Sequence, residues 1–289
     1  LRPVMAYSSL FLSHRWSLTT DHYPIITDRG ENMLKEYEYA ITGLREEFIE
    51  ACKSVFGESL VAIINKGSTV KGGFIPGLSD MDLHVYLKDD AFVYSDFLKL
   101  ELGLNLQEKM DELIRRYDIG GGPVQVIMIN VSKQRDWSGP LPNTYLVLYG
   151  DDCPEPPPKA EEMLEYDRDN LQNPHYGYGL VNSFVDKTND ALTGYVRRLN
   201  PAVTPTLYRA LSLLTREPLR VWRMTKFEVL EALEKLEMED AAELVELGRK
   251  FYELASQHQQ TCDDLELCKE TLRVGYRILD IGRQIGLRS

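Results

Sequence analysis

The sequence predicts an α+β protein, with a small mixed sheet and covering helices in its first half and a bundle of helices in its second. In the first half, short apolar runs at residues 60–65, 81–87 and 124–131 are flanked by glycine, serine or charged residues, a pattern typical of strands. In the second half, apolar residues recur every three or four positions, which is the spacing of amphipathic helices. This change of period predicts the fold class.

Two domains are expected, because one hydrophobic core rarely serves more than about 250–300 residues and the chain has 289. The four prolines between residues 154 and 158 make a stiff linker between the domains. We therefore place a poorly structured extension at residues 1–32, a first domain with the sheet at 33–153 and a helical domain at 159–289.

Helices are expected on both sides of this linker. In the first domain, residues 34–55 carry apolar side chains at helical spacing up to Gly57, and residues 92–117 do so up to the glycines at 120–122. The first two strands are expected to pair across the glycine-rich connection between them. The expected helices of the second domain span residues 180–199, 205–223, 226–236, 241–258 and 265–285.

Composition narrows the class of partner. The net charge of −12 repels nucleic acid and attracts cations, so a small cationic acceptor fits better than an RNA or DNA end. No apolar run approaches the roughly 20 residues that a membrane helix needs. The four cysteines show no C-x-x-C spacing, so we expect free thiols in a reducing cytoplasm and no zinc site. Nothing in the sequence indicates an oligomeric state.

The functional candidate is a Gly67-Ser68 turn followed by Asp80 and Asp82. Alternate residues of a strand share a face, so both aspartates point one way while Met81 and Leu83 point into the core. Two carboxylates on one face repel each other, and a divalent cation would make the arrangement favourable. Oxygen ligands favour Mg²⁺, which in turn brings nucleotide phosphates. The plainer alternative is a solvated Asp-x-Asp beside a tight turn.

Gly67-Ser68, a spacer and Asp80-Met81-Asp82 resemble the signature of the polymerase-β-like nucleotidyltransferase superfamily. The resemblance implies that Gly67 and Ser68 hold the triphosphate and that Asp80 and Asp82 hold the catalytic metal. It also implies a third carboxylate on the next strand. This chain has Gln125 there, and an amide cannot take up a proton at neutral pH.

Three explanations of Gln125 remain open. The strand alignment has slipped, the base comes from elsewhere, or transfer is weak or absent. Glu165 and Asp167, in the acidic stretch that surrounds the proline linker, are the candidates for a base supplied from elsewhere. Trp137 either stacks on a sugar or base or covers the core.

The second half resembles the helical domain of the streptomycin/spectinomycin-type adenylyltransferases around residues 210–236. In that family a lysine opening a helix reaches the nucleotide phosphates and a tyrosine on the next helix assists. The matching positions are Lys226 and Tyr252, with Thr225 as the helix N-cap. The alternatives are a surface lysine and a half-buried core tyrosine.

The sequence thus predicts a cytoplasmic nucleotidyltransferase that uses Mg²⁺ and moves AMP from ATP onto a hydroxyl of a small acceptor. An aminoglycoside acceptor, and with it antibiotic resistance, fits the acidic surface. The alternative is a weak or inactive nucleotide-binding regulatory protein, which Gln125 favours.

Overall fold

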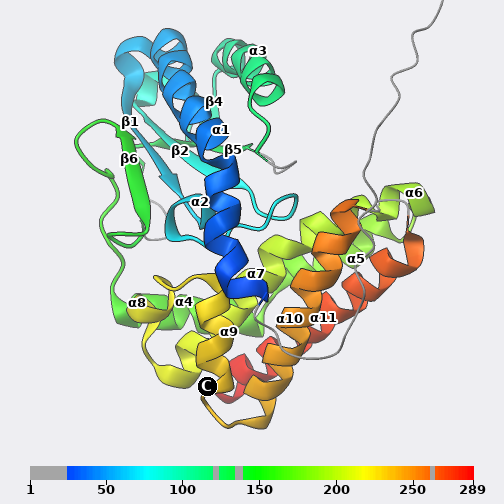
Figure 1. Cartoon of the computed structure of the whole chain (residues 1–289). Coiled ribbons are helices and arrows are strands. Elements are labelled where there is room, and N and C mark those ends of the chain that lie inside the picture. Colours follow the sequence, from blue (N-terminus) through cyan, green and yellow to red (C-terminus); the bar gives the residue numbers. More distant parts are fainter. Residues whose placement is uncertain (1–24, 120–123, 134–138, 261–263) are drawn as a thin grey trace, which may run out of the picture.

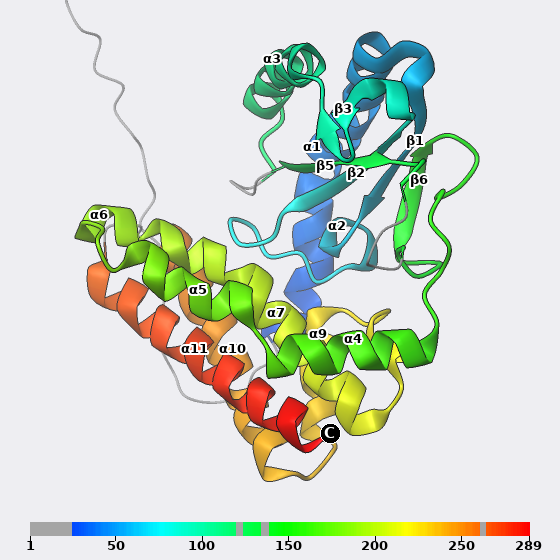
Figure 2. The same cartoon turned by 180° about the vertical axis from the view of Figure 1, so that it is seen from behind.

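The computed structural model describes residues 25–119, 124–133, 139–260 and 264–289. The α+β class is confirmed: Figure 1 shows the sheet, α1 and α3 in the upper part of the molecule and the helical half below, with α1 running alongside the sheet to the helical half. The chain passes from one half to the other between β6 (Tyr145–Tyr149) and α4 (Ala160–Gln172), as Figure 2 shows from behind. Within the described ranges, every helix is too short or too polar to cross a lipid bilayer.

The sheet confirms the three expected strands and adds β6 at its edge. Its order is β5-β2-β1-β6, formed by β1 (Leu60–Lys66), β2 (Met81–Leu87) and β5 (Val124–Asn130). As expected, β1 and β2 are neighbours, and β1 runs antiparallel to both β2 and β6, whereas β2 and β5 run parallel. The parallel pair places Gln125 directly opposite Asp82.

One face of the sheet is covered by α1 (Ile25–Phe56) and α3 (Leu100–Arg116). The core on this side joins Leu44 of α1 to Met81 and Leu83 of β2, and all three side chains are buried. The other face carries a smaller apolar cluster that includes Tyr86. Because strand residues alternate, Asp82 lies on the side of β2 that faces away from α1.

Two expectations for the first half need correction. Helix α1 begins at Ile25 and not near residue 34, so residues 25–32 of the expected extension are helical, whereas residues 1–24 lie outside the described ranges. A polar stretch that follows Pro24 can enter a helix without an apolar period, because its backbone hydrogen bonds form within the segment. Residues 92–98 form the hairpin of β3 (Phe92–Tyr94) and β4 (Phe97–Leu98), since Ser95 takes a positive φ of 50° that ends any helix there.

The helical half also departs from the expected boundaries. The helix expected at 180–199 is divided among three helices, and Pro201 and Pro205 lie inside the third, not at a helix start. Arg216, with a φ of 58°, ends that helix. The helices of this half are α4, α5 (His175–Phe184), α6 (Asn189–Leu192), α7 (Gly194–Thr215), α8 (Pro218–Val221), α9 (Lys226–Glu234), α10 (Glu239–Gln260) and α11 (Leu265–Arg288).

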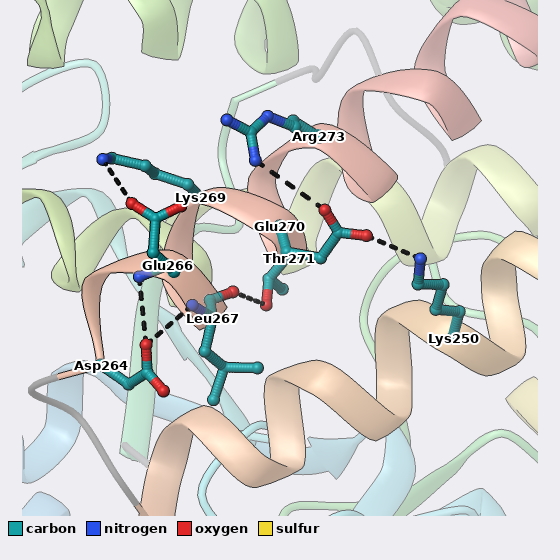
Figure 3. A network of polar contacts seen from close by, with 8 residues as sticks. All are labelled: Lys250, Asp264, Glu266, Leu267, Lys269, Glu270, Thr271 and Arg273. Carbon is teal, nitrogen blue, oxygen red and sulfur yellow. Dashed lines mark hydrogen bonds and ion pairs between the residues drawn. The ribbon is translucent and has the colours of Figure 1, made fainter.

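Figure 3 shows the residue that caps the start of α11 and the ion pair between side chains of α11 and α10. The Asp264 side chain caps the helix by accepting hydrogen bonds from the backbone N–H groups of Glu266 and Leu267 at 3.1 and 3.0 Å. Glu270 of α11 pairs with Lys250 of α10 at 2.6 Å. The pair is exposed, so it contributes orientation more than stability.

One loop of the sheet half is packed into the core of the helical half. Ile75 and Leu78, from the connection between α2 (Ser68–Lys71) and β2, are 8% and 2% exposed and lie among the buried apolar residues of the helical half. Asn200 of α7 donates a hydrogen bond to the Leu78 carbonyl at 3.4 Å. The loop that leads to Asp80 is therefore fixed by the helices.

Truncating Leu78 should loosen this attachment. Leu78→Ala is expected to lower the free energy of unfolding by about 2–5 kcal/mol, because it leaves a cavity between the halves. Leu104→Ala, at a leucine of α3 that is 47% exposed, is the matched control and should change the free energy little. Denaturant unfolding measures both, and equal small losses would contradict the packing described above.

Candidate active site

The Gly67-Ser68 turn lies against one of the two aspartates. Gly67 has a φ of 80°, which confirms the expected sharp turn, and the short helix α2 follows it. A Cβ atom on Gly67 would collide with Oδ2 of Asp82. Glycine is therefore required twice, by its backbone conformation and by the close approach of the carboxylate.

The two aspartates face the same amide. Asp80 immediately precedes β2, and Asp82 is its second residue. With the Gln125 amide oriented by its partners, its nitrogen donates to Asp80 Oδ2 at 3.3 Å and to Asp82 Oδ1 at 3.0 Å. This geometry brings Asp80, Asp82 and Gln125 together, as the sequence predicted, and it gives the amide the role of a donor to both carboxylates.

The electrostatics of the pair suit a cation. Burial, followed by the charge of Asp80, raises the pKa of the Asp82 carboxyl, and Lys66 opposes this shift. Such a pair is relieved by a positive charge close to both carboxylates. Over the described ranges, no three His, Cys, Asp or Glu side chains cluster into a ready-made metal site. Two carboxylates nevertheless fit Mg²⁺, which usually takes one or two from the protein and fills its shell with water and phosphate oxygens.

Lys226 reaches the pair from the helical half. Thr225 caps α9 with a capping box that includes Glu228, so the expected N-cap is confirmed. The Lys226 side chain is only 7% exposed and donates to Ser79 Oγ at 3.0 Å, next to Asp80. Burial lowers its pKa to about 8, while Asp80 acts in the opposite direction. Lys226 is thus a buried cation and not a surface lysine.

Tyr252 of α10 lies beside Lys226. The lysine ammonium sits 5.4 Å from the centre of the tyrosine ring, and the tyrosine hydroxyl shares a hydrogen bond with Thr204 Oγ1 at 3.1 Å. Tyr252 is 3% exposed, so it is more deeply buried than the half-buried core residue considered from the sequence. The structure therefore brings Lys226 and Tyr252 together, and it places the ring under the cation.

Arg197 is a candidate that sequence analysis did not identify. This residue of α7 has a buried Nη2 atom without a hydrogen-bond partner in the described structure, and the charge of Asp80 acts on its guanidinium. Arginines of an amphipathic helix usually lie on its solvated face. The sequence alone therefore does not indicate that Arg197 lies within electrostatic reach of Asp80.

Lys71 forms a second link between the halves. Its ammonium donates to the carbonyls of Trp222 and Met224, both at 3.0 Å, and lies 4.7 Å from the centre of the Tyr208 ring. Burial lowers the pKa of Lys71 to about 8. Lys71 therefore anchors the turn to the segment that precedes α9.

Asp167, one of the two candidates for a base supplied from elsewhere, has its contacts within the helical half. Asp167 is buried in the helical half, where it accepts a hydrogen bond from Trp222 Nε1 at 3.0 Å and lies 3.9 Å from Arg209 Nε. Burial raises its pKa. Glu165 is exposed on α4.

Two other predictions concern Trp137 and the cysteines. Trp137 lies outside the described residues. Cys52, Cys153 and Cys268 are free thiols, as expected.

No protein-family model and no curated protein sequence matches this chain. Among solved structures, it is similar to the spectinomycin adenyltransferase AAD(9) of Enterococcus faecialis, crystallised with ATP and spectinomycin. The two share 12% sequence identity with a TM-score of 0.47, over 83% of this chain and 99% of that one. Similarity of this degree assigns no activity to this chain.

The buried Lys71 should make stability depend on alkaline pH. Because its pKa is about 8 in the folded chain against an ordinary 10.5, the unfolded chain binds more protons between these values. The free energy of unfolding should therefore rise as the pH increases from about 8 to 10.5, and Lys71→Met should remove that part of the rise. Denaturant titrations at several pH values measure it, with Lys53→Met on α1 as the exposed control. Parallel curves for wild type and Lys71→Met would contradict the assignment.

Proposed function

We propose that this protein is a nucleotidyltransferase that moves a nucleoside monophosphate, AMP from ATP, onto a hydroxyl group of a small acceptor. The observation that carries the proposal is the meeting of two aspartates, Asp80 and Asp82, with the glycine turn on one side and the buried Lys226 on the other. Carboxylates for a divalent cation and fixed cations for phosphates are the parts that phosphoryl transfer requires.

In this proposal, Asp80 and Asp82 hold Mg²⁺. The donor set is oxygen alone, and the burial of Asp82 beside the charge of Asp80 disfavours the doubly charged pair unless a cation is present. When bound, the ion would neutralise the triphosphate and orient it for attack.

The nucleotide phosphates would lie between the two halves. Gly67 and Ser68 would hold the β- and γ-phosphates, and Lys226 would contact them from the opposite side, with its ammonium fixed by Ser79 and Tyr252. Arg197, with its unpartnered buried nitrogen near Asp80, would add a second positive charge. These fixed cations stabilise the negative charge that passes to pyrophosphate as it leaves.

The reaction is a substitution at the α-phosphorus. The acceptor oxygen forms a bond to phosphorus, the bond from phosphorus to the bridging oxygen breaks, and pyrophosphate departs. The acceptor hydroxyl also loses a proton. Gln125 cannot accept it, because its amide has no basic atom and already donates to both aspartates. Its role here is to orient the pair.

The same observation favours a second candidate function. A protein that binds ATP and Mg²⁺ through these residues, but transfers nothing, would serve as a nucleotide-binding regulator. Gln125 supports it, because the residue opposite Asp82 on β5 holds the carboxylates without offering a base. Both functions require nucleotide binding, and only the first releases pyrophosphate.

A polycationic acceptor of the aminoglycoside type is the acceptor we propose. Its support is the net charge of −12, which would draw such a molecule to the protein. Other small hydroxyl compounds are competing acceptors, and a panel separates them.

The deciding experiment is pyrophosphate release from ATP with Mg²⁺ across a panel of aminoglycosides and neutral hydroxyl compounds. We expect release that depends on one acceptor and is lost in Asp80→Asn, because that variant removes one of the two carboxylates. ATP binding without release from any acceptor would favour the regulatory function. Absence of ATP binding would contradict both.

Gln125→Glu tests the role of the amide. A carboxylate at this position can take up a proton and can join the cation site, so the rate of release should stay equal or rise with Mg²⁺ present. Without Mg²⁺ the variant should be less stable to heat than the wild type, since three carboxylates would then face one another. A lower rate despite an intact fold would show that the donor hydrogen bonds of Gln125 are needed for transfer.

A further inference from the structure

A buried polar cluster lies beneath the Gly67-Ser68 turn, on the face of the sheet covered by α1. Its centre is Asn65, the second-last residue of β1, whose side chain is completely buried. An amide in such a place is stable only when its hydrogen bonds are satisfied, and an apolar residue would fill the space without that requirement. The contacts of Asn65 therefore show what this position does.

The amide nitrogen of Asn65 reaches two parts of the proposed site. It donates to the backbone carbonyl of Asp82 at 2.9 Å and to Thr69 Oγ1, in α2, at 3.0 Å. The first contact fixes the backbone of a proposed cation ligand, and the second fixes the residue after Ser68. One side chain thus ties the glycine turn to the start of β2.

Arg45 of α1 fixes the orientation of the Asn65 amide through hydrogen bonds. Its Nε and Nη2 atoms donate to Asn65 Oδ1 at 2.9 and 2.5 Å, and Nη2 also donates to the Thr69 carbonyl at 3.0 Å. Two of these bonds come from adjacent nitrogens of one planar guanidinium, which fixes direction as well as distance. We call Arg45, Asn65 and Thr69 the turn clamp.

The turn clamp fixes the distance between the Gly67-Ser68 turn and Asp82. The glycine turn and Asp82 belong to different elements, and the carboxylate of Asp82 already touches the only space that a side chain on Gly67 could occupy. A small displacement of the turn would open a gap there or create a clash. In the proposed site, the separation of the turn from Asp82 would set the distance between the phosphate oxygens and the cation.

We propose that Arg45 and Asn65 are positioning residues for the nucleotide and its cation, and that they act through Thr69 and the backbone of Asp82. This inference rests on the proposed nucleotide binding and deepens it. Neither residue touches the substrate. Their effect is on the coupling between the cation and the phosphates, so it shows most clearly in how ATP binding depends on Mg²⁺.

The test is Arg45→Lys in the full chain. Lysine keeps the positive charge but cannot make the paired contact with Asn65. We expect the Kd for ATP at fixed Mg²⁺, and the Mg²⁺ concentration for half-maximal binding, to rise by about 10- to 100-fold, as is typical when the support of a metal ligand is lost. Titration calorimetry measures both, and a thermal melt without ligands reports the fold.

Arg116→Lys is the matched control. Arg116 of α3 pairs with Glu47 of α1, so its replacement removes a contact of the same helix without reaching the turn. It should leave ATP binding and its Mg²⁺ dependence unchanged.

Asn65→Asp gives a second variant, which keeps an acceptor for Arg45 and loses the donor to the backbone carbonyl of Asp82. The variant that combines Arg45→Lys and Asn65→Asp should bind ATP about as tightly as the weaker-binding of the two single variants. The two effects should not add, because both residues act through one cluster.

The outcomes are distinguishable. Wild-type affinity and Mg²⁺ dependence in Arg45→Lys would overturn the positioning role while leaving the proposed function intact. A loss of affinity with an unchanged Mg²⁺ half-point, together with a lower melting temperature, would show a merely structural role and would overturn it too. If the wild type itself does not bind ATP with Mg²⁺, the proposed function fails, and the inference fails with it.

Discussion

The site depends on the contact between one loop of the sheet half and the helices. The loop that leads to Asp80 inserts Leu78 among the apolar residues of the helical half, and its Ser79 accepts a hydrogen bond from the buried Lys226. A buried ammonium is costly unless oxygen atoms or aromatic faces surround it, and here a hydroxyl and the ring of Tyr252 do so. This contact holds acids from one half and cations from the other at a single place.

The charge around the aspartates is opposite to that of the chain. The protein carries a net charge of −12, yet three basic residues of the described ranges interact electrostatically with Asp80 or Asp82. Lys66 lies opposite Asp82 on β1, Lys226 and Arg197 act on Asp80, and Lys71 lies close enough to Lys66 and Lys226 for their charges to interact. The net charge of the chain therefore differs in sign from the charge that these side chains contribute beside the aspartates, and only the net charge acts on a distant molecule.

Gln125 shows how strand register decides chemistry. The parallel pairing of β2 and β5 sets it opposite Asp82. An amide there stabilises two like charges by donating to both, whereas an acid would have added a third. The amide therefore supplies hydrogen bonds to both carboxylates without adding a third negative charge or a basic atom.

Local patterns in the sequence determined much of this protein. The three strands, the shared face of the aspartates, the turn at Gly67 and the cap at Thr225 all follow from interactions within a few residues, so spacing and residue type predicted them. The hairpin after residue 91 was missed, because aromatic and aliphatic residues there also fit a helical period. Only the tertiary structure decided which distant side chains meet. It brought Arg197 within electrostatic reach of Asp80, kept Asp167 within the helices and buried Asn65 under the turn. Contacts between residues far apart in the chain depend on how the helices pack, and no local period encodes that packing.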